Sequence, residues 1–540
     1  MAHTVTFLPV GKTVRVEDNT TLLQAAGQAG LLVDAPCGGS GTCAKCRMRI
    51  RSGQAATGGS SQHLSAEELA AGWRLACGTK VTGPLEVEVP GDSLVARLDT
   101  ILVEGEPVPI RRDPHTLGHL GVAIDLGTTT VAGTLFDLHT GLERASFATM
   151  NRQIPLGDDV ISRIAAVRKS PANLALLQSR AVGTLNEIIR ALCEACDETP
   201  GAIHKLTVAG NTAMQQLLLG LDPSPLGEAP FAPAFIDAQT VGAARLGVLA
   251  SPEATLTVFP QIGGFVGGDT VAGLLASRFD SLARPTLLVD IGTNGELALL
   301  KNGAVSASSA AAGPAFEGAR IRQGMRAAAG AIDQVWLQNG DLRHHVIGDV
   351  APRGLCGSAL VDTVAELLRL GLIDPSGMLA LPDQPPPALT GALTKRLVAS
   401  ENGNAFVIAY DETGSPSVTL TQQDIRELQL ASGAIRAGIE TLLRREGLTV
   451  RDLDTVLLAG GFGNYIRREN ALRIGLLPPI HYLSIRFIGN ASLTGAKRAL
   501  LSQAEMARAQ TLRARTTHVE LAAEPHFTDL FMEHMLFPSE

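Results

Sequence analysis

The chain has 540 residues, of which 45% are hydrophobic and 57 are glycines, and its net charge is −8. This length and composition predict about two to four domains of the α/β class, rich in turns and with a large buried core. The acidic balance argues against nucleic-acid binding. Neither a secretory leader nor an apolar run long enough to span a membrane is visible, so we expect a cytoplasmic protein with no membrane partner.

Residues 1–91 contain four cysteines whose spacing predicts an iron–sulfur centre. Cys37, Cys43 and Cys46 follow a C-x5-C-x2-C pattern, and Cys77 stands alone further on. Four thiolates can hold a 2Fe–2S cluster, two on each iron, and here the first gap is one residue longer than in the plant-type spacing. A structural zinc site usually takes two tight cysteine pairs, and disulfide frameworks belong to small secreted domains. We therefore predict a 2Fe–2S cluster on these four residues.

The segments around the cysteines are typical of a small sheet. HTVTFLP, KTVRVE and LEVEVP alternate as strands do, and TLLQAAGQAG reads as a short helix, an order that matches a ferredoxin-like β-grasp domain. Lys45, Arg47, Arg49 and Arg51 alternate with Cys46, Met48 and Ile50, so a strand would present the four cations on one face. That face is either simply solvated or able to attract an acidic electron-transfer partner.

Residues 92–119 are expected to form a linker, because three prolines and scattered charges interrupt any regular pattern. The remaining chain contains an internal duplication. LGVAIDLGTTTVAGTLFDLHTGLERASF, from Leu120, and TLLVDIGTNGELALLKNGAVSAS, from Thr286, each predict a strand, a tight Gly-Thr turn and two further strands. Each half ends in a strand that runs into glycine or asparagine and a helix, in VAGNTAM and LAGGFGN. We therefore expect two βββ-α-β-α lobes, in a middle domain at 120–280 and a C-terminal domain at 281–540.

The repeated Asp-x-Gly-Thr turns predict a polyphosphate site between the two lobes. A Gly-Thr hairpin exposes backbone N–H groups and hydroxyls without bulk, and so can surround phosphate oxygens. Asp125 and Asp290, at the strand ends, can hold a magnesium ion directly or through water. The glycines of AGGFGN allow close approach of a base or ribose. No Walker A loop is present, so this is a different kind of nucleotide site.

Two further segments are expected near the cleft. GGFVGGDTVAGLLA, from Gly263, reads as a helix of small residues that connects the lobes and carries Asp269. The segment from Ala310 to Gly330 combines glycines with Glu317, Arg320, Arg322 and Arg326, and it can line the phosphate site, contact a partner or form a plain surface loop.

The two hairpins followed by AGGFG resemble the actin, sugar-kinase and heat-shock chaperone ATPase superfamily, in which these motifs are called phosphate 1, phosphate 2 and adenosine. The resemblance implies a duplicated actin-like fold that binds ATP with magnesium, and it makes Asp125, Asp290 and Glu296 the expected catalytic residues. The residues that it assigns to the nucleotide are Gly127, Thr128, Thr129, Thr130, Asn211, Thr212, Gly292, Thr293, Asn294, Gly460, Gly461 and Gly463.

A 2Fe–2S module joined to such an ATPase resembles the reductive activators of corrinoid proteins. The motifs that carry this resemblance are PCGGSGTCAKC, RLAC, IDLGTTT, VAGNTAM, VDIGTNGE, AAGPAFEGA, LCGSALVD and LAGGFGNYI. It implies ATP-dependent transfer of one electron from the cluster to Co(II), which restores Co(I) for a methyltransferase system. The implied partners are a corrinoid protein and an electron donor, and a homodimer is suggested. Two other hypotheses stay open, namely a small-metabolite kinase with the ferredoxin domain as redox sensor, and an actin-like assembly to which a ferredoxin docks.

Overall fold

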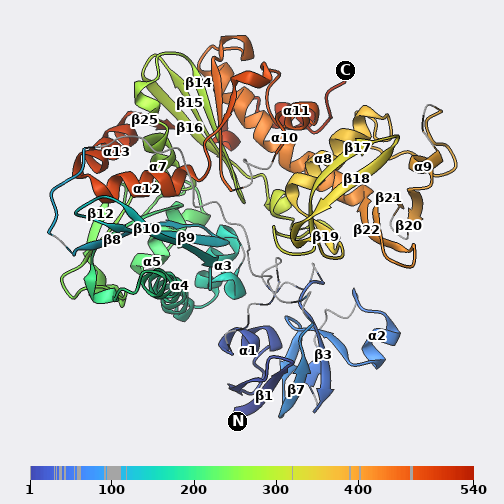
Figure 1. Ribbon diagram of the computed structural model, residues 1–540, viewed down its shortest axis with the longest axis horizontal. Coiled ribbons are helices and arrows are strands. Elements are labelled where there is room, and N and C mark those ends of the chain that lie inside the picture. Colours follow the sequence, from blue (N-terminus) through green and yellow to red (C-terminus); the bar gives the residue numbers. More distant parts are fainter. Residues whose placement is uncertain are drawn as a thin grey trace.

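A computed structural model gives the architecture of the chain (Figure 1). It describes residues 2–29, 31, 33, 35, 39, 41, 44–53, 55–57, 63–90, 93, 111–116, 118–157, 159–318, 320–387, 389, 391–400, 403–461 and 466–539. Figure 1 shows a small N-terminal domain in blue, a first lobe in teal and green, and a second lobe that extends to the right in yellow and orange.

The N-terminal domain is a five-stranded sheet in the order β2-β1-β7-β3-β5, crossed by helix α1. Alternation in β1 places Val5 and Phe7 in the core, where both are fully buried beside Met48 of β3. A capping box between Thr21 and Gln24 starts α1. The predicted β-grasp fold is confirmed. Its elements are β1 (Ala2–Leu8), β2 (Lys12–Glu17), α1 (Leu22–Gln28), β3 (Arg47–Ser52), β4 (Ala55–Thr57), α2 (Ala66–Ala70), β5 (Trp73–Leu75), β6 (Thr79–Val81) and β7 (Leu85–Glu88).

The first lobe is a six-stranded sheet in the order β10-β9-β8-β11-β13-β12. β8 pairs antiparallel with β9 but parallel with β11, so the ends of β8 and β11 meet at one edge and deliver Asp125 and Asn211 to the same place. Its elements are β8 (Leu120–Leu126), β9 (Thr130–Asp137), β10 (Glu143–Met150), α3 (Val160–Lys169), α4 (Ala172–Cys196), β11 (Ile203–Gly210), α5 (Thr212–Leu219), β12 (Gln239–Gly242), α6 (Ala243–Leu246) and β13 (Thr255–Val258).

The second lobe repeats this sheet, in the order β24-β23-β14-β15-β16-β25. The series β16-β15-β14-β23 corresponds to β10-β9-β8-β11, with the same pairing directions, and this confirms the predicted duplication and the actin-like α/β fold. The buried helix α10 packs against this sheet. The elements are β14 (Thr286–Ile291), β15 (Gly295–Lys301), β16 (Ala304–Ala310), α10 (Gln422–Arg445), β23 (Thr455–Ala459), α11 (Arg468–Arg473), β24 (Ile485–Phe487), β25 (Thr516–His518) and α14 (Phe527–His534).

Two small sheets and helix α8 are inserted between β16 and α10 and form the right-hand part of Figure 1. Parallel pairing of β17 with β19 brings the start of α8 to the edge of the cleft. The elements are β17 (Ala331–Gln338), β18 (Asp341–Val346), β19 (Gly354–Leu355), α8 (Gly357–Arg369), α9 (Gly391–Thr394), β20 (Leu397–Ser400), β21 (Gly403–Tyr410) and β22 (Pro416–Thr421).

Three helices join the lobes: α7 (Gly268–Ala276), α12 (Ala491–Leu501) and α13 (Gln503–Arg515). Residues of both sheets and of α7 and α12 share one buried core. A Cβ on Gly495 of α12 would lie 2.1 Å from the carbonyl oxygen of Ala272 in α7, so only glycine allows this close crossing. The predicted connecting helix therefore exists, although it begins at Gly268 rather than at Gly263. In the described part of the chain, no helix is long and apolar enough to cross a membrane.

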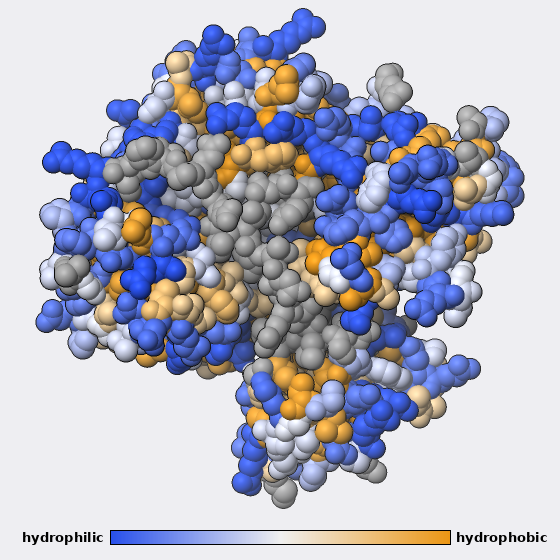
Figure 2. Space-filling view, viewed as in Figure 1, coloured by the Kyte–Doolittle hydropathy of each residue, from blue (hydrophilic) through white to orange (hydrophobic). Residues whose placement is uncertain are grey.

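The surface in the same view carries both kinds of side chain (Figure 2). Hydrophilic residues dominate the outer rim of both lobes, and hydrophobic ones show in smaller areas between them. Single exposed apolar residues, such as Leu142 and Leu483, are ordinary on a folded domain and need no partner to explain them.

Candidate nucleotide cleft and iron–sulfur module

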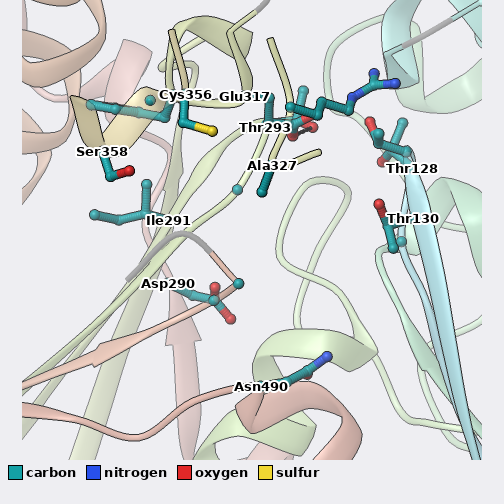
Figure 3. Close-up of a pocket in the computed structure, with 18 of the residues that line it drawn as sticks. Thr128, Thr130, Asp290, Ile291, Thr293, Glu317, Ala327, Cys356, Ser358 and Asn490 are labelled. Carbon is teal, nitrogen blue, oxygen red and sulfur yellow. Dashed lines mark hydrogen bonds between the residues drawn. The ribbon is translucent and has the colours of Figure 1, made fainter. Parts of the chain in front are cut away.

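The two Gly-Thr hairpins face one cavity of about 520 Å³ between the lobes (Figure 3). Thr128 and Thr130 stand on one wall, Cys356 and Ser358 on the opposite side, and Asp290 with Asn490 at the base. Of the residues that the sequence assigns to this site, those on the cavity wall are Asp125, Gly127, Thr128, Thr129, Thr130, Asn211, Asp290, Gly292, Thr293, Asn294, Glu296, Gly460 and Gly461. Gly463, Cys37 and Cys43 lie outside the described residues.

Buried polar contacts hold the first hairpin in place. A Cβ on Gly127 would lie 2.4 Å from the Thr130 carbonyl oxygen, so the turn needs glycine there. The Asn211 amide donates to the Thr128 hydroxyl at 2.9 Å. Arg163, which is fully buried on α3, donates to the Thr128 carbonyl oxygen at 2.5 Å and to the Gln153 side chain at 2.9 Å. The hairpin is therefore fixed from behind by a cation that no sequence motif marks.

The second hairpin is joined to the neighbouring loop through a side chain. The Thr293 hydroxyl donates to the Glu317 carboxylate at 2.5 Å, and Glu317 and Arg326 both line the cavity. Glu317 and Arg326 of the glycine-rich segment from Ala310 thus lie on the cavity wall rather than on a plain surface loop. A Cβ on Gly460 would lie 2.6 Å from Oδ1 of Asp290, so only glycine lets the adenosine-motif turn lie against this carboxylate.

Four carboxyl groups gather at the base of the cavity, and burial raises the pKa of each. The pKa of Asp290 rises to about 7, first through burial and then through the charges of Asp269 and Asp125. The pKa of Asp269 rises to about 6, and that of Glu296 rises well above its usual range. Asn490 and Ser492 of the second half donate to Asp125 at 2.9 and 2.7 Å, and these bonds partly offset the effect of burial.

The carboxyl groups at the bottom of the cavity are suited to a cation that binds together with phosphate groups. Among the described residues, no three acidic, histidine or cysteine side chains converge closely enough to enclose a metal by themselves. Mg²⁺ characteristically keeps several waters and takes only one or two carboxylates beside the phosphate oxygens. The donor set therefore fits a magnesium ion held mainly by nucleotide phosphates and water, to which Asp125 and Asp290 would offer carboxylates.

Thr212, which we expected to bind the nucleotide, is not among the residues on the cavity wall, and part of the opposite wall consists of residues that were not predicted as site residues. Thr212 is 1% exposed and its hydroxyl donates to the Gly263 carbonyl oxygen at 2.8 Å, so it supports the wall from behind.

On the far wall, Asp333 pairs with His345 at 2.6 Å, and this bond raises the pKa of the imidazole. Burial and then Asp333 raise the pKa of Cys356 to about 12, so this residue stays a thiol. Its motif LCGSALVD belongs to the family resemblance, but no sequence pattern predicted that this segment lies at the cavity.

The described cysteines of the N-terminal domain suit a cluster site. Antiparallel pairing of β3 with β5 places Cys46 opposite Ala76, whose N–H donates to the Cys46 carbonyl oxygen at 2.8 Å, so Cys77 follows at the same end of the strands. Cys46 is buried, Cys77 is half-buried, and neither forms a disulfide with a described residue. Cys46 and Cys77 therefore fit two of the four ligands of a 2Fe–2S cluster.

The four cations on either side of Cys46 contact groups within the chain. Arg47 pairs with Glu68 at 2.9 Å, Arg51 pairs with Glu88 at 2.5 Å, and Arg49 donates to the Ala71 carbonyl oxygen. Lys45 precedes β3 and reaches the second lobe, where it donates to the carbonyl oxygens of Gly318 and Gly324. The four residues therefore do not form one free basic face.

Matches to protein-family models cover three successive parts of the chain. Residues 5–82 match the 2Fe–2S iron–sulfur cluster binding domain, residues 120–282 the RACo middle region, and residues 284–540 the C-terminal domain of RACo, the ASKHA domain. Fold and matches together define the class of protein: a 2Fe–2S ferredoxin domain followed by an actin-like ASKHA domain.

Comparison with individual proteins is more specific. The chain is 38% identical to the corrinoid activation enzyme RamQ of Eubacterium limosum, over 77% of this chain and 70% of RamQ. It is 26% identical to the [Co(II) methylated amine-specific corrinoid protein] reductase of Methanosarcina barkeri, over 76% of each chain. A solved structure of a reductive activator for corrinoid, iron–sulfur protein is 30% identical, with a TM-score of 0.73, over 99% of this chain and 98% of that one. The chain belongs to the RACo family.

Proposed function

We propose that this protein restores a corrinoid protein of a methyltransferase system by ATP-dependent transfer of one electron from its 2Fe–2S cluster to Co(II). The reduced cluster, once bound by its cysteines, would supply the single electron that converts Co(II) to Co(I). One observation carries the proposal. The same chain contains a ferredoxin-like sheet with Cys46 and Cys77 at one end of its strands, and a cleft lined by two Gly-Thr hairpins. The names of the relatives, a corrinoid activation enzyme and a corrinoid protein reductase, point the same way.

The need for ATP follows from the redox chemistry. Each ~59 mV of unfavourable potential costs a factor of about ten in the equilibrium for one electron. Co(I) corrinoid is a strong reductant, so an ordinary ferredoxin cluster is expected to reduce Co(II) poorly. Nucleotide binding or hydrolysis can supply the missing free energy if it changes how the lobes hold the partner.

The residues of the cleft have separate roles in this proposal. The N–H groups and hydroxyls of the two hairpins bind the phosphate oxygens. Asp125, held by Asn490 and Ser492, links the two halves beneath the phosphates. With a pKa of about 7, Asp290 is partly protonated near neutral pH, and a bound cation would displace that proton. Magnesium bound there would neutralise phosphate charge, and Cys37, Cys43, Cys46 and Cys77 would hold the cluster.

The test is a coupled assay with a Co(II) corrinoid protein, a chemical reductant and the purified chain. Growth of the Co(I) absorbance should require both ATP and the cluster, and ATP turnover should rise when the corrinoid protein is added. Formation of a phosphorylated metabolite, or of nucleotide-dependent filaments, without Co(I) would instead favour one of the other two hypotheses.

The proposal also includes an electron donor, a cellular location, an oligomeric state and a domain arrangement for this protein. An external electron donor reduces the cluster, the protein acts in the cytoplasm, and two copies form a homodimer. The module at 1–91 is tethered by the linker at 92–119 to the middle domain at 120–280 and the C-terminal domain at 281–540.

A further inference from the structure

The N-terminal domain contacts both lobes at segments that are linked by hydrogen bonds to the two Gly-Thr hairpins. We propose that its docked position strengthens nucleotide binding, so that docking of the ferredoxin module and occupation of the cleft favour each other. This inference rests on the proposed nucleotide binding. It concerns an interaction surface between parts of the same chain, at α1 and Lys45 on the module and at Pro155 and the Gly318–Gly324 loop on the body.

The contact with the second lobe is made by the Lys45 ammonium. It donates to the carbonyl oxygens of Gly318 and Gly324, at 3.3 and 3.1 Å. These two residues form the neck of a loop, where a Cβ on Gly324 would lie only 1.9 Å from the Gly318 oxygen. Two carbonyl oxygens aimed at one point repel each other, and a cation between them removes that repulsion. Lys45 therefore holds the neck closed.

The neck is directly connected to the phosphate site. Glu317 precedes Gly318 and accepts the hydrogen bond of Thr293 in the second hairpin. Met325 and Arg326 follow Gly324, and both line the cavity. A closed neck thus sets the positions of groups on both sides of the phosphate 2 hairpin before any nucleotide arrives. Groups ordered in advance lower the entropic cost of binding, so release of Lys45 should weaken nucleotide affinity.

The contact with the first lobe is made by α1. A Cβ on Gly27 would lie 3.6 Å from both Pro155 Cβ and the Arg180 guanidinium, so this end of α1 lies against the segment Ile154–Leu156. Gln153 begins that segment and accepts from Arg163, which in turn donates to the Thr128 carbonyl oxygen of the first hairpin. The module therefore contacts each lobe at a segment that is linked to that lobe's hairpin, through Glu317 in the second lobe and through Gln153 and Arg163 in the first.

The experiment measures the affinity of a slowly hydrolysed MgATP analogue for the full-length protein by calorimetry, with iron content matched between variants. Lys45→Met should weaken binding about fivefold or more, which is the lower part of the range for coupled sites. Arg51→Met is the matched control, because it removes a nearby cation that pairs with Glu88 inside the module, and it should leave the affinity unchanged.

A second variant separates docking from a local effect on the loop. Gly27→Leu pushes the α1 contact apart without touching the loop, and it should weaken binding to a similar degree. In the double variant the losses should fall well short of additive, because either change releases the same module. Wild-type affinity in Lys45→Met, or full additivity in the double variant, would overturn the inference. Absence of nucleotide binding by the wild-type protein would instead overturn the proposed function.

Discussion

At the scale of single residues, the site brings together buried carboxyl groups whose negative charges are unfavourable without a bound cation. Asp125, Asp269, Asp290 and Glu296 share one buried cavity base, and burial raises the pKa of each. A carboxyl group with a raised pKa is protonated in the empty cleft at mildly acid pH and must lose that proton to face a magnesium nucleotide. Ligand binding is therefore expected to release protons.

The affinity for MgATP should accordingly fall as the pH is lowered through the Asp290 pKa of about 7. Linkage to one proton limits the slope to about tenfold per pH unit. Asp290→Asn, which cannot titrate, should bind more weakly at pH 8 and lose most of this pH dependence. Calorimetry in two buffers of different ionisation enthalpy measures the proton release directly. The same slope in Asp290→Asn would show that another group is responsible.

The same groups affect the stability of the empty protein. Because the pKa of Asp290 is raised in the folded state, its contribution to stability is fully present below the unfolded value of about 3.8 and is lost as the pH rises towards 7. Without nucleotide, Asp290→Asn should therefore raise the melting temperature more at pH 8 than at pH 5. An equal shift at both pH values would contradict the assigned pKa.

The aspartates at the strand ends could be predicted because the Gly-Thr turns repeat 165 residues apart in the chain, at Asp125 and Asp290. Arg163, Asn490, Ser492 and Asp333 could not. Each belongs to a segment with no local motif. It reaches the cleft wall, or for Arg163 the back of the first hairpin, only because a distant element folds back, as when α12 brings Asn490 to Asp125. Periodicity and turn chemistry predict elements, whereas contacts across several hundred residues depend on tertiary packing.

At the scale of secondary-structure elements, the crossing of α7 and α12 holds the two lobes in one core. The sequence predicted a connecting helix of small residues from Gly263 but not the helix that it crosses, because the glycine at the crossing lies in α12. The backbones meet at Gly495, where a side chain would press on the Ala272 carbonyl group.

Gly495→Leu should therefore destabilise the protein by roughly 1–3 kcal/mol or more, since overpacking there cannot be relieved by a flexible side chain. The measurement is denaturant unfolding followed by circular dichroism. Gly242→Ala is the matched control, because no atom lies within 4 Å of the position that its Cβ would take and its φ is −65°. Equal midpoints for the two variants would mean that α7 and α12 can move apart at little cost.

At the scale of the whole molecule, the cluster module and the cleft are built from separate cores. Cys77→Ser should remove the reddish-brown absorbance and the bound iron, whereas the body should keep its unfolding transition. Cys193→Ser, at a buried packing position on α4, is the control and should keep full iron. Full iron and sulfide content in Cys77→Ser would show that this cysteine does not ligate the cluster.

The N-terminal domain contacts the second lobe through Lys45 and the first lobe through α1, and these two contacts restrict the motion of the lobes. The lobes touch each other through α7 and α12, and the module touches each lobe in turn, so three bodies form a closed ring of contacts. In an open chain of three bodies each hinge moves by itself, but in a closed ring no hinge can turn unless another yields. While the module is seated, the lobes therefore lose their independent hinge motion. A large rotation of the lobes around a bound partner protein must therefore either move the module together with a lobe or first break one of the module's contacts.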